Sequence, residues 1–314
     1  MAHAPQTELD ALYRDFADLN MEGGWHRRFP ALWPEPRRNF LPHVWHYADV
    51  KPILDRAGEL IDTQQAERRN LTMFNPVEGN IYSTVRTIVA AYQMIKPGEV
   101  ARAHRHTPNA LRLILDGKGT STVVDGKEVE MRPGDVLLTP NWAWHSHANH
   151  GDAQCYWMDF LDVPLVHLLE PMFYEPHPNG IEPAVETLAE APIAFRWEDT
   201  LARLDAESRA RPGEPAVVEL GPAQLDTIAL HMIRITAGDA TRPLRTTANI
   251  IFAAVEGSGV AEIDGQSFTW SRGDTIAVPA WRPFHLCADN EAVLLRVSDE
   301  PVMRKLGWLR SEAP

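Results

Sequence analysis

Two pairs of histidines, each spaced two residues apart, are the side chains in this sequence best suited to chemistry. His104 and His106 end the stretch "QMIKPGEVARAHRH", and His145 and His147 stand in "NWAWHSHAN". On a β-strand, residues i and i+2 point to the same face, so each pair projects to one side. Neutral imidazole is the commonest biological ligand of first-row transition metals. The spacing therefore predicts a metal site formed by His104, His106 and His145.

The alternative is a structural role, in which these histidines line the inside of a barrel and make only hydrogen bonds there. A lone His-x-His pair is more often of this kind, because short motifs recur by chance. The second pair, at the end of a later hairpin in the same part of the chain, favours the metal site.

The strands that would hold the histidines belong to a module that occurs twice. The segment 115–140, "LDGKGTSTVVDGKEVEMRPGDVLLTP", matches 255–279, "VEGSGVAEIDGQSFTWSRGDTIAVP", turn for turn. In each copy, short runs rich in Val, Ile, Leu and Thr are separated by Gly-x-Gly, Asp-Gly and Gly-Asp turns, which is typical of strands joined by hairpins. The sequence predicts a mainly β protein with two antiparallel jelly-roll barrels.

The remaining segments are predicted to frame these barrels. Helical patterns over 8–20 and 51–62 flank a stretch rich in Trp, Phe and Pro. We divide the chain into an N-terminal helical and aromatic arm (1–78), a first barrel with the metal site (79–164), a linker (165–226), a second barrel (227–300) and a C-terminal tail (301–314).

Composition excludes several classes of partner. The chain has 314 residues, 44% of them hydrophobic, and a formal net charge of −13, which would repel nucleic acid and anionic membranes. No run of about 18 apolar residues occurs, and the N-terminus lacks the apolar region of a secretory signal. Cys155 and Cys287 are too few for a disulfide framework. We expect a cytoplasmic protein that binds neither nucleic acid nor a membrane.

The histidine spacing resembles the two motifs of the cupin fold. The first motif is matched by Gly98, His104, Arg105, His106 and Gly117, and the second by Gly134, Pro140, His145 and Asn149. Many cupins carry a glutamate ligand four residues after the second histidine, where this chain has Ala110. Three histidines without a carboxylate imply one branch in particular. The chain resembles the gentisate 1,2-dioxygenase group, which includes salicylate and 1-hydroxy-2-naphthoate ring-cleaving enzymes.

This resemblance covers most of the chain, from "AERRNLTMFNP" to "PVMRKLGWLR". It implies a bicupin that binds one Fe(II) per subunit, uses O2 as co-substrate and assembles as a homotetramer. It also implies the reaction, in which O2 is inserted between the carboxyl-bearing and hydroxyl-bearing carbons of a hydroxybenzoate. Gentisate is the family's representative substrate, and salicylates with a 5-substituent such as a nitro group are expected as well.

The resemblance also assigns residues to a substrate pocket. Arg112 matches the arginine that contacts the substrate carboxylate, and a planar guanidinium suits a carboxylate because it donates two parallel hydrogen bonds. Val89 is a departure, since several members carry a tryptophan there, and it predicts a larger pocket on that side. The other predicted pocket residues are Gln93, Arg68, Arg69 and Trp142 for substrate binding, and His147 and Asp159 for catalysis.

The second barrel lacks the metal ligands and is predicted to be structural. A shift of 139 or 140 residues places Pro243 or Leu244, and Arg245 or Thr246, over the first two histidines, and Phe284 over His145. His285 lies one position late, and a metal needs its full ligand set and geometry.

Two other classes of function stay open from the residues. The chain could be a non-oxidative or regulatory bicupin that binds a small aromatic acid, or another metal-dependent cupin enzyme such as an isomerase or a hydrolase. Ala110 argues against the four-ligand isomerases, whereas Arg112 and Gln93 favour an aromatic-acid pocket. Fold alone does not separate these functions.

Overall fold

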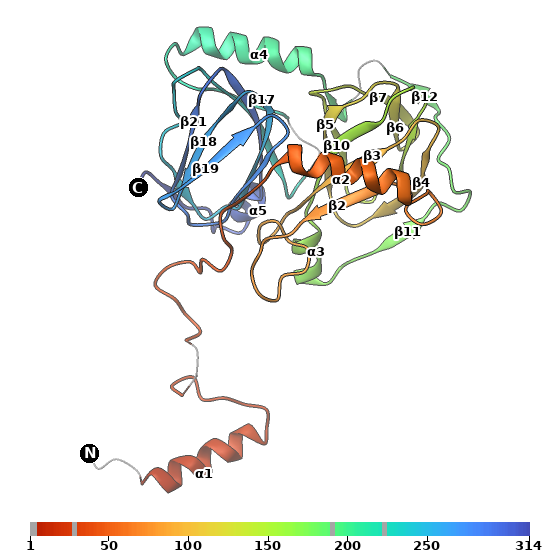
Figure 1. Ribbon diagram of the computed structural model, residues 1–314. Coiled ribbons are helices and arrows are strands. Elements are labelled where there is room, and N and C mark those ends of the chain that lie inside the picture. The colour runs from red at the N-terminus through yellow and green to blue at the C-terminus, as the bar shows by residue number, and fades with distance from the viewer. Residues whose placement is uncertain (1–4, 27–29, 189–191, 222–224) are drawn as a thin grey trace. The chain divides into compact units, whose positions relative to one another are not determined.

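The structure is a computed structural model that describes residues 5–26, 30–188, 192–221 and 225–314. The chain divides into two units, 1–37 and 38–314, and the second contains both barrels, which lie side by side (Figure 1). No helix in the described ranges is long and apolar enough to cross a membrane. The helices are α1 (Gln6–Ala17), α2 (Tyr47–Leu60), α3 (Val163–Leu169), α4 (Trp197–Ala210) and α5 (Glu300–Lys305).

The first barrel consists of two six-stranded sheets, in the orders β13-β8-β5-β10-β3-β2 and β11-β4-β9-β6-β7-β12. Short strands joined by tight turns form it, as the repeat predicts. Its strands are β2 (Arg69–Met73), β3 (Val89–Ile95), β4 (Val100–His106), β5 (Ala110–Asp116), β6 (Thr120–Val124), β7 (Lys127–Met131), β8 (Val136–Thr139), β9 (His145–Asn149), β10 (Cys155–Leu161), β11 (Tyr174–Pro176), β12 (Glu186–Thr187) and β13 (Ala194–Phe195).

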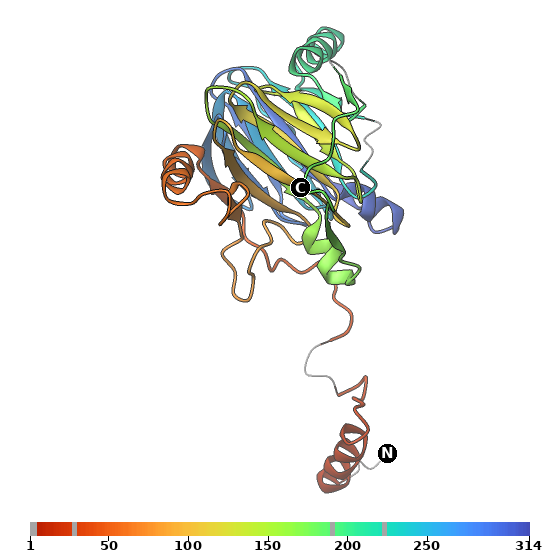
Figure 2. The same ribbon diagram turned by 90° about the vertical axis from the view of Figure 1, so that its right-hand side faces the viewer.

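The second barrel repeats this plan with sheets in the orders β1-β20-β17-β22-β15-β14 and β19-β18-β21, beside the short pair β16-β23. Its strands are β1 (His43–Trp45), β14 (Ala216–Glu219), β15 (Ala229–Ile235), β16 (Arg245–Thr246), β17 (Ile250–Glu256), β18 (Ser258–Ile263), β19 (Gln266–Ser271), β20 (Thr275–Val278), β21 (Phe284–Ala288), β22 (Ala292–Ser298) and β23 (Ser311–Glu312). Figure 2 shows α4 and α3 at opposite ends of the paired barrels.

A shared core joins the barrels. Strand β3 is buried along its whole length because one face lines the first barrel and the other faces the second. The Tyr92 hydroxyl donates to the Gly273 carbonyl oxygen at 2.8 Å, and Thr275 Oγ1 lies 3.0 Å from Met158 Sδ. Burial of a large apolar side chain contributes about 1.5 to 3 kcal/mol. The second barrel therefore stabilises the sheet that carries part of the first barrel's interior.

Helix α2 leads into the first barrel but begins against the second, and helix α4 leads into the second barrel but begins against the first. The backbone N–H of Tyr47, at the start of α2, donates to Asp274 Oδ1 at 2.8 Å, and that of Trp197, at the start of α4, donates to Asp135 Oδ1 at 2.8 Å. Both aspartates come from the repeated Gly-Asp turn. A carboxylate at a helix N-terminus accepts an otherwise unpaired N–H and complements the helix dipole. The repeat therefore includes the helices as well as the barrels.

The predicted division at 78, 164 and 226 differs from the sheets. Strands β1 and β2 come from the predicted arm, and β11, β12, β13 and β14 come from the predicted linker. Strands β11, β12 and β13 join the first barrel, whereas β1 and β14 join the second. Strands of two to five residues carry too little periodicity to be recognised in a sequence. Helix α3 ends at Leu169, and Glu170 after it adopts a left-handed conformation with φ of 69°.

Each barrel has a buried aspartate that accepts a hydrogen bond from the segment leading into the other barrel. Asp299 accepts hydrogen bonds from the backbone N–H of Asn249 at 2.7 Å, from Asn249 Nδ2 at 2.8 Å and from the Thr87 hydroxyl at 2.6 Å. Thr87 lies just before β3 of the first barrel. The counterpart in the first barrel is formed by Asp162, Asn109 and Thr227.

Replacing Asp299 with Ala should lower the free energy of unfolding by about 2 to 3 kcal/mol, because buried donors of Asn249 and Thr87 would lose their acceptor. Chemical denaturation of the two proteins measures this difference. Asp289→Ala is the matched control, since Asp289 is exposed. Equal stability of the Asp299 and Asp289 variants would show that this carboxylate does not hold the barrels together.

Candidate metal centre and substrate pocket

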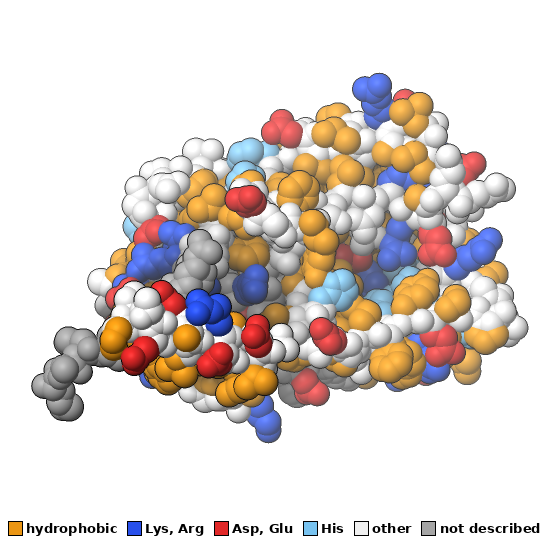
Figure 3. All heavy atoms as spheres, turned by 90° about the horizontal axis from the view of Figure 1, so that it is seen from below, with side chains coloured by type: hydrophobic (Ala, Val, Ile, Leu, Met, Phe, Trp, Pro, Cys, Tyr) orange, Lys and Arg blue, Asp and Glu red, His pale blue; other side chains and the backbone are white. Residues whose placement is uncertain are grey.

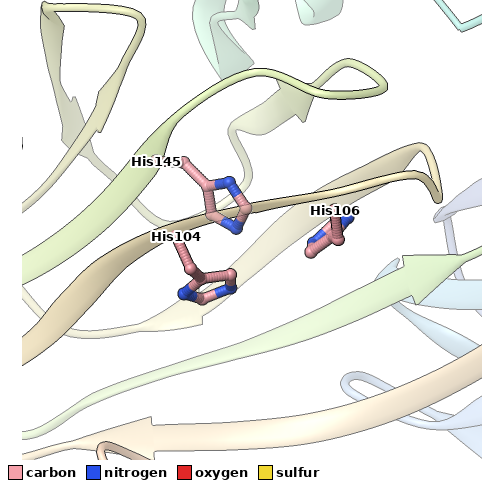
Figure 4. Close-up of side chains that lie close together, drawn as sticks. All are labelled: His104, His106 and His145. Carbon is pink, nitrogen blue, oxygen red and sulfur yellow. The ribbon is translucent and has the colours of Figure 1, made fainter. Parts of the chain in front are cut away.

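The pairing of β4 with β9 brings three histidines together. His104 lies directly opposite His145 in the antiparallel register, and opposite residues share a face of the sheet. His106 lies two residues farther along β4, on the same face. One ring nitrogen from each histidine lies within 4.8 Å of the others, and Figure 4 shows the three imidazoles converging. This spacing suits three ligands around one metal ion.

Backbone contacts orient the three rings. The Nδ1 atom of each ring lies near the carbonyl oxygen two residues away in the chain, at 3.1 Å for His104, 2.9 Å for His106 and 3.1 Å for His145. When Nδ1–H donates to a carbonyl, the lone pair on Nε2 is free to bind a metal. The Nε2 atom of His145 is buried and has no hydrogen-bond partner among the described residues. These side chains therefore fit a metal ion.

Burial keeps the three imidazoles neutral. It lowers the pKa of both His104 and His106 to about 4, and the nearby Arg68 adds to the shift at His104. The pKa of His145 lies well below its usual range, first because the ring is buried and then because Arg112 is close. The ligands are therefore unprotonated at neutral pH, which is the state that binds metal.

A buried charge pair lies beside the histidines. Asp159 faces Arg112 across the β10–β5 pairing, with its Oδ1 3.3 Å from Arg112 Nε, and the Arg112 Nη1 donates to Thr139 Oγ1 at 2.5 Å. Burial raises the pKa of Asp159 and lowers that of Arg112, and the ion pair opposes both shifts. Both side chains are at most 3% exposed, so each depends on its partner.

Asp159 is held in place by further donors. Trp157 Nε1 donates to Asp159 Oδ1 at 2.9 Å, and the Gln93 amide donates to Oδ2. Gln93 in turn accepts from Arg68 Nε. This chain of contacts joins Arg68, which lies outside the strands, to Arg112 inside the barrel. The two cations and the amide are therefore fixed relative to one another.

His147 follows His145 by two residues on β9 and points to the same face. Both of its ring nitrogens are buried without a hydrogen-bond partner in the described part of the chain. Burial holds its pKa well below the usual range, and Arg112 lowers it further. A neutral imidazole with no partner can accept a proton from a bound molecule.

The structure separates the two adjacent arginines. In the β2–β3 register, Arg69 pairs with Met94, whose side chain points to the face of β3 opposite that of Gln93. Arg69 Nη2 lies 2.5 Å from Glu99 Oε2 and its side chain is 1% exposed. Arg68 reaches the triad side, whereas Arg69 forms an ion pair behind the sheet.

Trp142 also lies away from the triad. The guanidinium of Arg105 lies 4.5 Å from the Trp142 ring centroid, and Arg105 alternates with His104 and His106 along β4. Trp142 is therefore on the outer face of that strand. Val89, in contrast, shares a face of β3 with Gln93 and is 7% exposed, so it lies in the barrel wall four residues away.

Tyr174 and Thr139 are neighbours of the site that the sequence did not reveal. The Tyr174 ring centroid lies 5.3 Å from that of His104, on a three-residue strand in the predicted linker. Thr139 accepts a hydrogen bond from Arg112 although it pairs with Ala110 in the sheet, so the spacing of the sequence does not indicate this contact. In the face drawn in Figure 3, histidine and basic side chains lie next to one another in a recess.

Comparison with known proteins agrees with this geometry. Residues 91–163 match the cupin domain. A gentisate 1,2-dioxygenase from a Streptomyces species is 35% identical over 98% of this chain and 96% of that protein. The chain belongs to the gentisate 1,2-dioxygenase family. Another relative in this dioxygenase family, a 5-aminosalicylate 1,2-dioxygenase from a Comamonas species, is 34% identical over 98% of this chain and 91% of its own.

A solved structure extends the match to the whole fold. The salicylate 1,2-dioxygenase from Pseudaminobacter salicylatoxidans superposes with a TM-score of 0.89, covers 99% of both chains and is 28% identical in sequence. The predicted bicupin architecture of this gentisate 1,2-dioxygenase family member is thereby confirmed.

The protein should bind one metal ion per chain, and His145→Ala should abolish that binding, because three converging imidazoles occur in the first barrel alone among the described residues. Metal content after Fe(II) loading and desalting measures this. His285→Ala is the control, since His285 lies beside the residue that replaces the ligand in the second barrel. Two metal ions per chain, or full loading of the His145 variant, would contradict the assignment.

Proposed function

We propose that the protein is an Fe(II)-dependent ring-cleaving dioxygenase that acts on a hydroxybenzoate, with gentisate or a 5-substituted salicylate as substrate and O2 as co-substrate. The observation that carries the proposal is the convergence of His104, His106 and His145 beside the buried Arg112. When Fe(II) is bound by three neutral ligands, it supplies redox chemistry with O2 and attraction for an anion. The relatives named above support ring cleavage between the carboxyl-bearing and hydroxyl-bearing carbons.

Arg112 would bind the substrate carboxylate. Its guanidinium is buried on β5 and already held by Thr139 and Asp159, so little conformational entropy is lost when it binds an anion. A buried guanidinium donates charge-assisted hydrogen bonds that are about twice as strong as neutral ones. Asp159 acts as a positioning residue, because it touches Arg112 and holds its direction.

Arg68 and Gln93 would complete the acid-binding side. Arg68 lies outside the strands, donates to Gln93 and is close enough to His104 to lower its pKa. Arg68 and Arg112 raise the local potential against the formal net charge of −13, which would otherwise repel an anionic substrate.

His147 would accept the proton of the substrate hydroxyl. Its buried ring is neutral and neither nitrogen has a partner among the described residues, so the unprotonated nitrogen can accept a hydrogen bond from a bound hydroxyl. The surrounding strands exclude water from this position, which strengthens the interaction.

We further propose that the enzyme is a cytoplasmic homotetramer. The family resemblance supports the tetramer, and the composition supports the compartment, since the chain carries only two cysteines and a net charge of −13.

Arg112→Ala should retain iron yet lower kcat/KM for gentisate about 30-fold to 1,000-fold, equivalent to about 2 to 4 kcal/mol for loss of a desolvated charge contact. An O2 electrode and a metal assay on the same sample measure the two effects. Arg102→Ala is the control, because Arg102 is exposed on β4. An Arg112 variant with wild-type kcat and KM would show that Arg112 does not bind the substrate carboxylate.

Val89→Trp should selectively slow the cleavage of 5-substituted salicylates, because the indole would fill the space proposed to accept the substituent. The expected difference from gentisate is about 1 to 3 kcal/mol in kcat/KM. Val100→Trp, at an exposed position of β4, is the control. Equal losses with gentisate, salicylate and the substituted acids would mean that Val89 does not contact the ring.

A further inference from the structure

The second barrel contains a cavity of about 280 Å³. Barrels of this size are normally filled by their own side chains, so an open interior is not expected of a purely structural domain. The volume is just below the range of about 300 to 1,000 Å³ that is typical of small-molecule pockets. Among the residues that line it are Ile233, Leu244, Phe252, Phe284, Arg242 and Arg296.

This cavity is the counterpart of the metal centre. Arg296 pairs with Phe252 across β22 and β17, as Asp159 pairs with Arg112 across β10 and β5. Phe252 therefore stands at the position of Arg112, and Arg296 stands at the position of Asp159. By the same repeat, Leu244, Phe284 and Ile233 occupy the positions of His104, His145 and Gln93.

The apolar part of the cavity lining includes two phenylalanines. Phe252 and Phe284 are 2% and 6% exposed, and their ring centroids lie 5.8 Å apart at 57°. Two rings tilted in this way can offer both an edge and a face to a third ring. Leu244 and Phe284 face each other where His104 and His145 do in the first barrel, so the cavity suits binding without metal chemistry.

Three arginines and Glu214 also line the cavity, and of these arginines only Arg296 is largely buried. The Arg296 side chain is 17% exposed, and its Nε atom is buried with no hydrogen-bond partner among the described residues. Its Nη2 lies 3.3 Å from Glu300, which leaves Nε–H available. Arg242 is 84% exposed and lies 2.6 Å from Glu214. An unpaired buried N–H favours an anionic acceptor.

We propose that the second barrel binds a small aromatic monocarboxylate, with its ring against Phe252 and Phe284 and its carboxylate on Arg296. Phe252 and Phe284 offer contacts to an aromatic ring that phosphate and sulfate lack, and the volume excludes a long acyl chain. The site is independent of the metal centre, because none of its residues belongs to the first barrel.

Fluorine NMR with 4-fluorobenzoate on the anaerobic Fe(II)-loaded protein tests this. Two bound signals are expected, one broadened by iron and lost in Arg112→Met, the other sharp. Arg296→Met should raise the dissociation constant of the 4-fluorobenzoate that gives the sharp signal by at least about tenfold. Leu244→Trp should abolish the sharp signal, because the indole would fill the cavity. Leu244 is partly exposed, so this variant tests the site even if the Arg296 variant does not fold. Fluorobenzene, which has no carboxylate, should not compete.

Absence of the sharp signal in the folded wild-type protein, or its persistence in Leu244→Trp, would overturn the second site. Loss of the broadened signal alone would count against the proposed function and leave the second site standing. The Arg112→Met variant therefore separates the two failures.

Discussion

The pairing of β4 with β9 is the interaction on which the functional part of the molecule depends. It places His104 opposite His145, and a slip of one residue would turn the ligands of one strand to the other face. The same burial that keeps the imidazoles neutral also removes Arg112 from water, and Arg112 is stable there because Asp159 faces it. Burial inside the first barrel therefore both keeps the histidine ligands neutral and holds the Arg112 guanidinium in place.

The two barrels share a frame but differ in what fills them. The first has a polar interior of histidines, Arg112 and Asp159, and the second has Phe252 and Phe284 at corresponding positions. A polar interior stabilises poorly, since buried polar groups gain little net free energy from their partners. The shared core between the barrels and the helices anchored at Asp135 and Asp274 offset this. The second barrel therefore supports the first while keeping an interior of its own.

The sequence contained the pattern of the metal centre and, through the family resemblance, only part of its surroundings. The His-x-His spacing and the repeated Gly-Asp turns are local, so both the triad and the two barrels could be predicted. Arg68 and Arg69 are adjacent in sequence, and only the register of β2 on β3 decides which one reaches Gln93. Trp142 is among the predicted pocket residues, yet its ring packs against the Arg105 guanidinium on the outer face of β4. Tyr174 arrives on a three-residue strand whose pairing is set by long-range contacts. Register and long-range pairing are tertiary properties, and residue spacing does not encode them.

Anomalous X-ray scattering at the iron absorption edge, from crystals grown anaerobically with Fe(II), tests the central claim most directly. The account predicts one peak per chain, bonded to the Nε2 atoms of His104, His106 and His145, with none inside the second barrel. No peak at the triad in iron-loaded crystals, or iron bound by other side chains, would contradict it.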